Sequence, residues 1–470
     1  MKPVPLSRIA SWTHGRLHGA APGFDTLIDA VSTDTRTLDA SDGRAALFVA
    51  LKGERFDGHD HVAVGLEAGA RAALVSREVD VAIPQVVVAD AERALAAFAA
   101  AVQHARDGKV VAVTGSNGKT SVKTLALAIL ERAGKAYANP GNRNNEIGLP
   151  LAVLDAPEDA DFAIYEMGAG KPGDIAYLTA VARPDVSLVN NIAPAHLERM
   201  GSLLGVADTK AAIYDALPSG GVAVINADDA FAPYFAQRAH GRRLIRFGLE
   251  ASADVTARGL RLDADGSAFT LATPQGDIPV TLALPGRHNV LNALAAASLA
   301  LGAGASLQAI AEGLAAARAV AGRLVTHRLP GGALLVDDSY NANPGSLAAA
   351  IDTLANAPGE RWLVLGDMRE LGADARALHA EAGRRARSAG ISRLLTLGPL
   401  SAAASDAFGD GARHFESHAA VAEAIHAALH PQLRVLVKGS RGSAMDRVVR
   451  ALLEQAGPQG SGTPGGMHAA

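Results

Sequence analysis

Continuous apolar runs separated by helical segments dominate the middle of the chain. Between residues 110 and 240 these runs are VVAVTG, FAIYEMG, VSLVNNI and VAVINAD. Strands that are apolar at nearly every position indicate a parallel sheet covered on both faces. The pattern therefore predicts a central α/β domain over residues 86–320 with a mostly parallel sheet.

A different pattern occupies residues 243–285, where apolar and polar residues alternate around the turn sequences DADG and PQGD. Such alternation between turns predicts a small antiparallel meander. A helix is predicted to follow from residue 288. The central domain should therefore combine a parallel sheet with a short antiparallel one.

Two further α/β regions flank this domain. Residues 1–85 mix short strand-like runs (ALFVAL, AALVS) with a helix candidate, HVAVGLEAGA, and an amphipathic segment begins at Asp90, a suitable N-cap. The runs ALLVDDS, RWLVLGD, RLLTLG and RVLVKGS predict a Rossmann-like C-terminal domain over residues 321–455. The Gly- and Pro-rich residues 456–470 are predicted to be disordered. Three domains also match a length of 470 residues at about 150 residues each.

Composition narrows the class of protein. Charged residues make up 20% and the net charge is −4, without a dense Lys/Arg stripe, so we expect no nucleic-acid partner. The absence of cysteine excludes disulfides, thiolate catalysis and Cys-ligated metals. The N-terminus lacks an apolar signal region, and the Ala-rich stretch from His288 is broken by Gly and polar residues. We therefore predict a cytoplasmic protein without membrane insertion.

The segment VVAVTGSNGKTSVKTL, residues 110–125, has the form of a phosphate-binding loop between a strand and a helix. Backbone N–H groups at such a turn wrap phosphate oxygens, Lys119 would reach the β- and γ-phosphates, and the Thr120 hydroxyl would bind Mg²⁺. The first Gly of the common loop is replaced by Val113. The alternative is a Gly-rich turn that binds nothing, and the loop does not distinguish a hydrolase, a kinase and a ligase. The residues predicted to bind ATP here are Gly115, Ser116, Asn117, Gly118, Lys119, Thr120 and Ser121.

Polar residues follow two later strands of the same sheet. Glu166 ends one apolar run, His196 lies just beyond another, and Lys210 falls in the helix predicted next. Ligands of open α/β sheets bind outside the carboxyl ends of the strands, so Glu166 and His196 should meet the nucleotide as Mg²⁺ ligands together with Thr120. The alternatives are a helix cap for His196 and a surface ion pair for Glu166.

A set of motifs resembles one family. In order, the motifs are TGSNGKTS, GNRNNEIGLP, EMGAG, NNIAPAHLERMGS, PGRHNVLNALAA, GRL, DDSYNANPGS, LGDMRELG and VKGSRGSAM. They resemble the Mur ligases, the ATP-dependent amide ligases of peptidoglycan precursor synthesis, over about residues 32–452. The short loop without a first Gly is usual in that family.

The resemblance implies a two-step reaction in which ATP phosphorylates a carboxylate and an amine then attacks the acyl phosphate. Lys119, His196, Lys210 and Arg323 match the catalytic positions, two Mg²⁺ ions are implied, and Lys210 matches a lysine that the family carries as a carbamate. The family usually continues with Lys-Gly-Glu-Ile, whereas this chain reads KAAI. A plain helix lysine is the alternative for Lys210.

The nucleotide contacts that the resemblance implies are spread over two domains. Asn292 would meet the adenine, with Asn289 and His288 less securely placed because either residue could instead cap the helix. Arg323 would reach the γ-phosphate from the domain junction, since its guanidinium offers a fork of donors. Asp338 would bind the ribose, and the C-terminal domain would close over the site.

The resemblance also implies contacts with the other substrates. Ser32, Thr35 and Arg36 would hold the UDP end, and Asn142, Asn144 and Asn145 the muramoyl end, although Asn residues also make ordinary turns. Tyr340, Asn341 and Asn343 would touch nucleotide or substrate unless they only form a turn. The turn containing Lys438, Ser440 and Arg441 would bind phosphate or the dipeptide carboxylate, with a surface loop as the alternative.

Within the family, the sequence is most similar to the members that add D-alanyl-D-alanine to a UDP-N-acetylmuramoyl tripeptide, which are expected to be monomers. Members that add the third residue usually carry Asp-Asn-Pro-Arg, which this chain lacks. Folylpolyglutamate synthases lack a UDP-binding N-terminal domain, which residues 1–85 resemble. A regulatory ATP-binding module and a plain ATPase or GTPase remain alternatives. Whether the third residue is diaminopimelate or lysine stays open.

Overall fold

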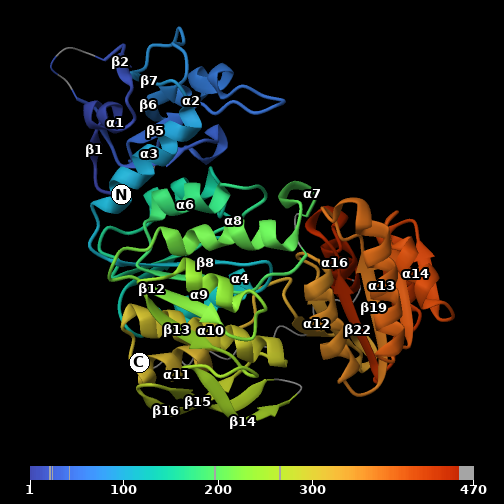
Figure 1. Ribbon diagram of the computed structural model, residues 1–470. Helices are drawn as coiled ribbons and strands as arrows, with labels where there is room; N and C mark the ends of the chain where they lie inside the picture. The colour runs from blue at the N-terminus through green and yellow to red at the C-terminus, as the bar shows by residue number, and fades with distance from the viewer. Residues whose placement is uncertain (21–22, 24, 42, 195–196, 264–265, 455–470) are drawn as a thin grey trace, which may run out of the picture.

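The computed structural model describes residues 1–20, 23, 25–41, 43–194, 197–263 and 266–454. Three α/β units follow one another along the chain, from the blue N-terminal unit through the green and yellow central unit to the orange and red C-terminal unit (Figure 1). His196 and the tail 456–470, which was expected to be disordered, lie outside the described residues. The predicted fold class, three α/β domains with a mostly parallel central sheet, is confirmed.

The N-terminal unit contains a five-stranded sheet in the order β2-β7-β6-β5-β4, and a separate two-stranded ribbon of β1 and β3. Within the sheet only β2 runs antiparallel to its neighbour. The strands are β1 (Val4–Pro5), β2 (Arg16–His18), β3 (Leu27–Ile28), β4 (Ala30–Ser32), β5 (Ala46–Val49), β6 (Ala70–Val75) and β7 (Gln85–Val87). The sheet therefore extends through Val87, past the boundary expected at residue 85.

Helices α1 (Leu6–Trp12), α2 (Val62–Glu67) and α3 (Ala91–His104) complete this region. Asp90 caps α3 as predicted, since its carboxylate accepts from the backbone N–H groups of Glu92 and Arg93. The apolar face of α3 packs on helices of the central unit, so α3 joins the two units.

The central sheet has six parallel strands in the order β13-β12-β11-β8-β10-β9. Side chains of β8 alternate: Val110 and Ala112 belong to the core on one face, Val111 and Val113 to the core on the other. The strands are β8 (Lys109–Thr114), β9 (Ala136–Ala138), β10 (Phe162–Glu166), β11 (Val186–Val189), β12 (Val222–Asn226) and β13 (Arg243–Phe247). Two covered faces explain the continuous apolar runs.

Helices cover both faces of this sheet, and Figure 1 shows α6 and α8 on one side and α10 and α11 on the other. The first face carries α5 (Gly148–Asp155), α6 (Asp174–Ala182), α8 (Leu203–Asp215) and α9 (Ala232–Arg238). The second carries α4 (Lys119–Leu130), α10 (Arg287–Ala303) and α11 (Leu307–Ala316). The short α7 (Leu197–Met200) precedes α8.

The antiparallel meander is confirmed, but it begins later than residue 243. It comprises β14 (Thr256–Leu262), β15 (Ser267–Thr273) and β16 (Gly276–Leu282) and packs on α11. Residues 243–247 instead form β13 and pair parallel with β12 at the edge of the central sheet. Exposed and buried residues alternate along β13, because this edge strand buries mainly one face. The same alternation is typical of antiparallel strands, and for this reason the sequence prediction assigned residues 243–247 to the meander.

The C-terminal unit has a six-stranded sheet in the order β17-β18-β22-β19-β20-β21, parallel except for β17. The strands are β17 (Val325–Arg328), β18 (Leu334–Asp338), β19 (Glu360–Gly366), β20 (Arg393–Leu397), β21 (Ala412–Phe415) and β22 (Leu433–Lys438). The helices are α12 (Pro344–Ala355), α13 (Ala375–Ser388), α14 (Ala402–Phe408), α15 (His418–His426) and α16 (Asp446–Glu454).

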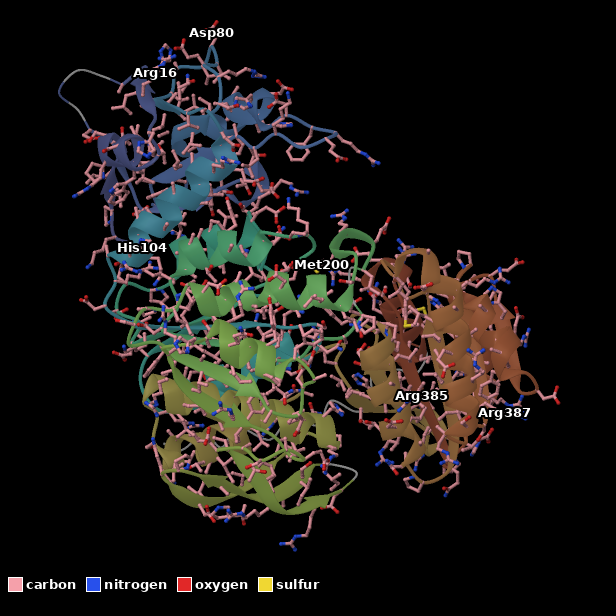
Figure 2. All side chains as sticks on the ribbon, in the orientation of Figure 1. Arg16, Asp80, His104, Met200, Arg385 and Arg387 are labelled. Atoms are coloured by element: carbon pink, nitrogen blue, oxygen red, sulfur yellow. The ribbon has the colours of Figure 1, made fainter. Side chains whose placement is uncertain are left out.

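The two larger sheets direct the carboxyl ends of key strands toward each other. In the central unit β8 leads into the glycine-rich loop and β10 ends at Glu166, while in the C-terminal unit β18 ends at Asp338. Figure 2 marks Met200 on the side of the central unit that faces the C-terminal unit. No helix among the described residues has the length and apolar character needed to span a membrane.

Candidate active site

The glycine-rich loop forms a tight turn between β8 and α4. Gly115 and Gly118 have φ angles of 149° and 77°, which side-chain-bearing residues rarely adopt. A Cβ atom at Gly118 would lie 2.6 Å from both Asn190 Nδ2 and Asn292 Oδ1. Conformation and space therefore both require glycine at the position that caps α4.

Lys119 folds back over this loop, and its Nζ donates to the Gly115 carbonyl oxygen across 2.7 Å. Burial lowers the pKa of Lys119, and the nearby Glu166 carboxylate opposes that effect. An ammonium beside a helix N-terminus and its backbone N–H groups is suited to bind phosphate.

Glu166 is the centre of a buried cluster beside the loop. Its Oε2 accepts from the Thr120 hydroxyl across 2.8 Å, and its Oε1 accepts from Asn144 Nδ2, also across 2.8 Å. Lys123 Nζ lies 3.5 Å from Oε2. Burial opposes ionisation of Glu166, but Lys119, Lys123 and the two hydrogen bonds outweigh it and lower its pKa. Glu166 is 3% exposed, so the alternative of a surface ion pair is wrong.

The donor set of this cluster fits magnesium. Glu166 offers a carboxylate and Thr120 a hydroxyl, and Mg²⁺ takes one or two carboxylates with waters and substrate phosphates as its other ligands. Among the described residues, no three His, Asp or Glu side chains gather into a metal cluster. The second expected ligand, His196, lies outside those residues, so its role stays a prediction.

The sequence prediction missed two residues of this cluster, Lys123 and Asn139, and a third beside the glycine-rich loop, Asn190. Lys123 lies one helical turn after Lys119, and its Nζ donates to the Asn139 carbonyl oxygen across 2.8 Å. The Asn139 side chain in turn makes hydrogen bonds with the backbone N–H and C=O of Glu166, across 2.8 and 3.1 Å. Asn190, just after β11, donates to the Asn117 carbonyl oxygen. The four-residue spacing of the two lysines was the one available signal.

Lys210 is almost completely buried in α8, with 2% of its surface exposed. Burial, aided by the charge of Lys119, lowers its pKa to about 7. Within the described residues, no hydrogen bond or ion pair reaches its amine. A lysine with this pKa is about half neutral near pH 7, and the neutral amine is the form that reacts with CO₂ to give a carbamate.

A cavity of about 260 Å³ lies between the loop and the C-terminal unit. Thirteen of the predicted site residues line it, and they come from both units. They are Ser116, Asn117, Gly118, Lys119, Thr120, Ser121, Asn289, Asn292, Arg323, Asp338, Asn341, Asn343 and Lys438. A nucleotide bound at the loop would therefore contact both units at once.

Arg323 connects the linker between the units to the loop. Its Nη2 donates to the Thr120 hydroxyl across 3.0 Å, and its guanidinium lies 4.4 Å from the centroid of the Tyr340 ring. The Arg441 guanidinium lies 5.3 Å from the same ring. The Tyr340 ring thus makes one cation–π contact with Arg323 and another with Arg441, and the substrate contacts of Tyr340 and Arg441 stay predictions.

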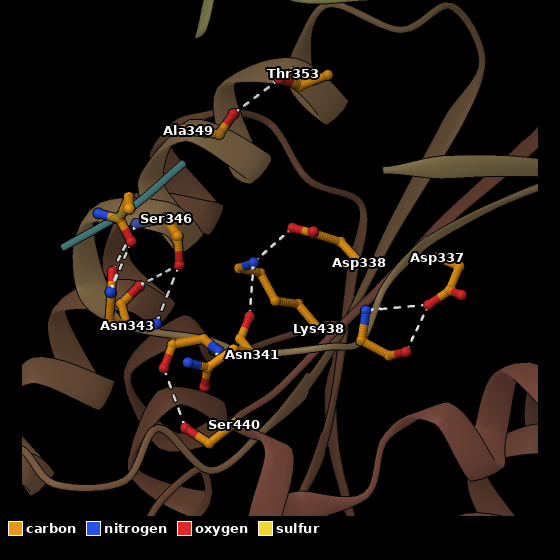
Figure 3. A network of polar contacts seen from close by, with 12 residues as sticks. Asp337, Asp338, Asn341, Asn343, Ser346, Ala349, Thr353, Lys438 and Ser440 are labelled. Carbon is orange, nitrogen blue, oxygen red and sulfur yellow. Dashed lines mark hydrogen bonds and ion pairs between the residues drawn. The ribbon is translucent and has the colours of Figure 1, made fainter. Parts of the chain in front are cut away.

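Asp338 and Lys438 form a buried ion pair at the C-terminal wall of the cavity (Figure 3). Lys438 Nζ lies 2.5 Å from Asp338 Oδ2 and also donates to the Asn341 carbonyl oxygen across 3.0 Å. Lys438 is 3% exposed. The alternative of a surface loop is therefore wrong for Lys438, which lines the cavity. Its contact with phosphate or the dipeptide stays a prediction.

Asn343 both caps a helix and reaches across the units. Its Oδ1 accepts from the Ser346 backbone N–H at the start of α12, and its Nδ2 donates to Asn117 Oδ1 across 2.7 Å. Ser440, in contrast, is buried among protein groups: its hydroxyl donates to the Ala342 carbonyl and accepts from the Arg369 backbone N–H. Ser440 thus fixes the turn and does not line the cavity.

The predicted adenine side of the cavity is formed by the first turns of α10. Asn292 Oδ1 accepts from Asn190 Nδ2 across 3.3 Å, and Asn289 Nδ2 donates to the Pro285 carbonyl oxygen. Neither His288 nor Asn289 caps the helix, since Gly286 is its N-cap. His288 Nε2 is buried without a hydrogen-bond partner in the described part of the chain, and burial lowers the pKa of His288 to about 4.

The six residues predicted to hold the UDP and muramoyl ends of the substrate do not line this cavity. Ser32 bonds within its own turn, to the Asp34 carbonyl and the Thr37 hydroxyl, and the exposed Arg36 pairs with Asp34. Thr35 begins a short 3₁₀ helix there. Asn142 is exposed, Asn145 accepts from the Gly148 N–H at the start of α5, and Asn144 instead joins the Glu166 cluster. Their substrate contacts stay predictions.

Family models match nearly the whole chain in three consecutive parts. They describe a Mur ligase family catalytic domain at residues 28–113, a Mur ligase middle domain at 113–300 and a Mur ligase glutamate ligase domain at 322–441. The UDP-N-acetylmuramoyl-tripeptide–D-alanyl-D-alanine ligase of Escherichia coli strain K12 is 46% identical over 454 residues, which cover 96% of this chain and 98% of that protein. The chain belongs to the Mur ligase family.

Solved structures of Mur ligases share the three-unit architecture. A ligase from Acinetobacter baumannii, named for UDP-N-acetylmuramoylalanyl-D-glutamyl-2,6-diaminopimelate and D-alanyl-D-alanine, is 33% identical with a TM-score of 0.87; the match covers 97% of this chain and 99% of that one. A Thermotoga maritima ligase in complex with ADP is 27% identical with a TM-score of 0.82, and the match covers 91% and 97%. The predicted resemblance is thereby confirmed.

Proposed function

We propose that this Mur ligase joins D-alanyl-D-alanine to a UDP-N-acetylmuramoyl tripeptide and hydrolyses ATP to ADP and phosphate as it does so. Full-length relatives at 46% and 37% identity carry the name of this activity. The observation that carries the proposal is the cavity between the glycine-rich loop and the C-terminal unit, to which Lys119, Arg323 and Asp338 all contribute.

In the first step the C-terminal carboxylate of the tripeptide attacks the γ-phosphorus of ATP, and the bond to the bridging oxygen breaks, releasing ADP. The attacking carboxylate and the triphosphate are both anionic, so the site must hold them together against repulsion. Lys119 and Arg323 supply positive charge at the loop. The Thr120 hydroxyl accepts from Arg323 and donates to Glu166, so it fixes the position of Arg323 relative to Glu166.

In the second step the amine of D-alanyl-D-alanine attacks the acyl carbon. The amine loses a proton, the tetrahedral intermediate collapses, and phosphate leaves to give the UDP-N-acetylmuramoyl pentapeptide. The cavity is closed on one side by Asn343, which contacts Asn117 of the loop, so the acyl phosphate would be shielded from water. Shielding matters because water would otherwise hydrolyse the intermediate.

Magnesium, which would be held by Thr120 and Glu166 and by the predicted ligand His196, would neutralise phosphate charge in this site. We propose two ions and a carbamate on Lys210. Support for the carbamate is the burial of the Lys210 amine and its pKa of about 7. The binding of UDP by the N-terminal unit, the monomeric state and the cytoplasmic location belong to the same proposal.

The test is phosphate release by the purified protein with Mg-ATP and UDP-N-acetylmuramoyl tripeptide, with and without D-alanyl-D-alanine. We expect release that requires both substrates and a product heavier by one dipeptide, identified by mass spectrometry. Release without any peptide would indicate a nucleotidase. No release with any combination would indicate a regulatory ATP-binding module.

A further inference from the structure

Lys123 is a buried lysine that the two steps of the proposed reaction do not use. It lies on α4 one helical turn after Lys119, on the same face of the helix. Lys119 lines the nucleotide cavity, whereas Lys123 does not, and only 7% of the Lys123 side chain is exposed. An ammonium is costly to bury unless its N–H groups meet acceptors, so the groups around Lys123 indicate what it holds in place.

Three oxygen atoms surround the Lys123 ammonium. Its Nζ donates to the Asn139 carbonyl oxygen across 2.8 Å and to the Gly141 carbonyl oxygen across 3.1 Å. The third oxygen is Glu166 Oε2, at 3.5 Å from Nζ. An ammonium has three N–H donors, so these three acceptors account for all of them. Lys123 is therefore placed to hold protein groups and not to touch the reacting atoms.

The two carbonyl groups belong to the segment 139–145, which lies between β9 and α5, outside any helix or strand. The Asn139 side chain fixes the start of this segment, since it accepts from the Glu166 backbone N–H and donates to the Arg143 carbonyl oxygen, each across 2.8 Å. Gly141 has a φ of 54°, and a Cβ atom there would meet no atom within 4 Å. The segment is loosely packed at Gly141, so the bond from Lys123 ties it to α4 at that point.

The far end of the same segment reaches the Glu166 carboxylate. Asn144 Nδ2 donates to Glu166 Oε1 across 2.8 Å, and the Asn144 carbonyl oxygen accepts from the Gly168 backbone N–H across 2.7 Å. The other carboxylate oxygen, Oε2, accepts from the Thr120 hydroxyl of α4. One oxygen of Glu166 is thus held by the segment and the other by α4. Lys123 links these two elements directly.

We propose that Lys123 is a positioning residue for phosphoryl transfer. By holding the segment 139–145 on α4, it keeps Asn144 and Thr120 at the separation that fixes both oxygens of Glu166. The inference rests on the proposed ligase function, in which Glu166 lies beside the bound phosphates.

Loss of the Lys123 ammonium should act through geometry. The carbonyl groups of Asn139 and Gly141 then lose their donor, the segment gains freedom, and the Asn144 amide no longer meets Glu166 in one fixed arrangement. Misplacing a group at a reaction centre slows the chemical step more than it weakens binding. Because Lys123 does not line the nucleotide cavity, the affinity for a nucleotide should change little.

The experiment compares Lys123→Met, Asn144→Ala and the double variant with the wild type. Phosphate release at saturating Mg-ATP, UDP-N-acetylmuramoyl tripeptide and D-alanyl-D-alanine gives kcat, and calorimetry with ADP in the absence of magnesium gives the nucleotide affinity. We expect Lys123→Met to lower kcat by about 10–100-fold and to change the ADP affinity by less than about twofold. The double variant should be no more than about threefold slower than the slower single variant, because both substitutions act on the same contact with Glu166.

Further variants separate positioning from a general loss of structure. Hydrogen exchange over residues 139–147 should be faster in Lys123→Met than in the wild type. Lys123→Arg keeps the charge and the donors for the carbonyl groups, so it should recover part of the rate. Lys135→Met, which removes an exposed lysine paired with Asp159, should match the wild type in every measurement. If Lys123→Met does not fold, Lys123→Gln takes its place with the same expected results.

An unchanged kcat in Lys123→Met, or a loss in the double variant equal to the product of the two single losses, would overturn the positioning role. A fall in ADP affinity as large as the fall in kcat would also overturn it and assign Lys123 to a long-range charge effect. Wild-type exchange rates in Lys123→Met would do the same, and that measurement requires no turnover. A wild type that adds no dipeptide would therefore overturn the ligase function, while the exchange rates still decide whether Lys123 holds the segment.

Discussion

The Arg323 guanidinium donates to the Thr120 hydroxyl, and the same hydroxyl donates to Glu166. Three segments thereby meet at one oxygen atom: the linker to the C-terminal unit, the glycine-rich loop and the end of β10. Thr120 can make both bonds because a hydroxyl donates once and accepts elsewhere. The position of the C-terminal unit is thus coupled to the site at which phosphate charge must be neutralised.

The first prediction concerns Arg323→Lys. A lysine keeps the charge but loses the planar fork and the stacking on Tyr340, so we expect kcat/KM to fall by about 10²–10³-fold. The free energy of unfolding should change by less than about 1 kcal/mol, because the contacts that Arg323 makes are partly exposed to solvent. The measurements are phosphate release and urea unfolding.

Arg328→Lys is the matched control, because Arg328 is an exposed residue of β17, the strand that follows Arg323 in the C-terminal unit. It should retain wild-type rates. Wild-type rates in Arg323→Lys as well would show that the guanidinium has no role in transfer.

The second prediction separates the two contacts of Asn343. In Asn343→Asp the carboxylate still caps α12, but it loses the donor to Asn117 and presents oxygen to oxygen there. We expect near-wild-type thermal stability with kcat/KM lowered about tenfold. Asn343→Ala should lose the cap as well and be destabilised by about 1 kcal/mol. If Asn343→Asp is fully active, the contact between the units is dispensable.

Much of the site follows from local sequence. The glycines and Lys119 are set by the short strand–turn–helix segment, and Glu166 is set by the end of an apolar run. Because all six central strands are parallel, their carboxyl ends gather at one edge, so residues far apart in sequence could be placed together.

Side-chain partners were harder to foresee. Asn144, whose contact with the muramoyl group stays a prediction, donates to Glu166. Among the described residues, the Ser440 hydroxyl bonds to backbone groups of its own unit. An amide or hydroxyl suits a turn, a helix cap or a ligand equally well, so residue type alone cannot choose. Which of these partners a side chain takes depends on how loops from different strands pack together, and the sequence around a single loop does not encode that packing.

The third prediction is a pH dependence of stability from His379. This buried residue of α13 accepts from the Met368 backbone N–H through Nε2 and donates to the Ala375 carbonyl through Nδ1, so its imidazole is neutral. Burial lowers the pKa of His379 below the value of about 6.5 in the unfolded chain. Below that pH the unfolded chain binds more protons, so stability falls as pH falls.

We therefore expect the wild type to lose stability between pH 7 and pH 5, measured by urea unfolding. The His379→Gln variant should lose less stability over this pH range, since the amide oxygen of Gln can still accept from the Met368 backbone N–H and an amide does not titrate. His426→Gln, at an exposed position in α15, should follow the wild type. An identical pH dependence in His379→Gln and the wild type would assign the acid sensitivity to other groups.

The last prediction tests the carbamate on Lys210. The buried amine has no partner among the described residues, and its pKa of about 7 leaves it partly neutral, as carbamate formation requires. Lys210→Ala should lower activity by about 10²-fold or more, and added short-chain carboxylates should restore part of it by placing an anion in the vacated space. Lys210→Arg should not respond, because its side chain fills that space with a cation. Lys135→Ala is the surface control, and full activity of Lys210→Ala without added carboxylate would rule the carbamate out.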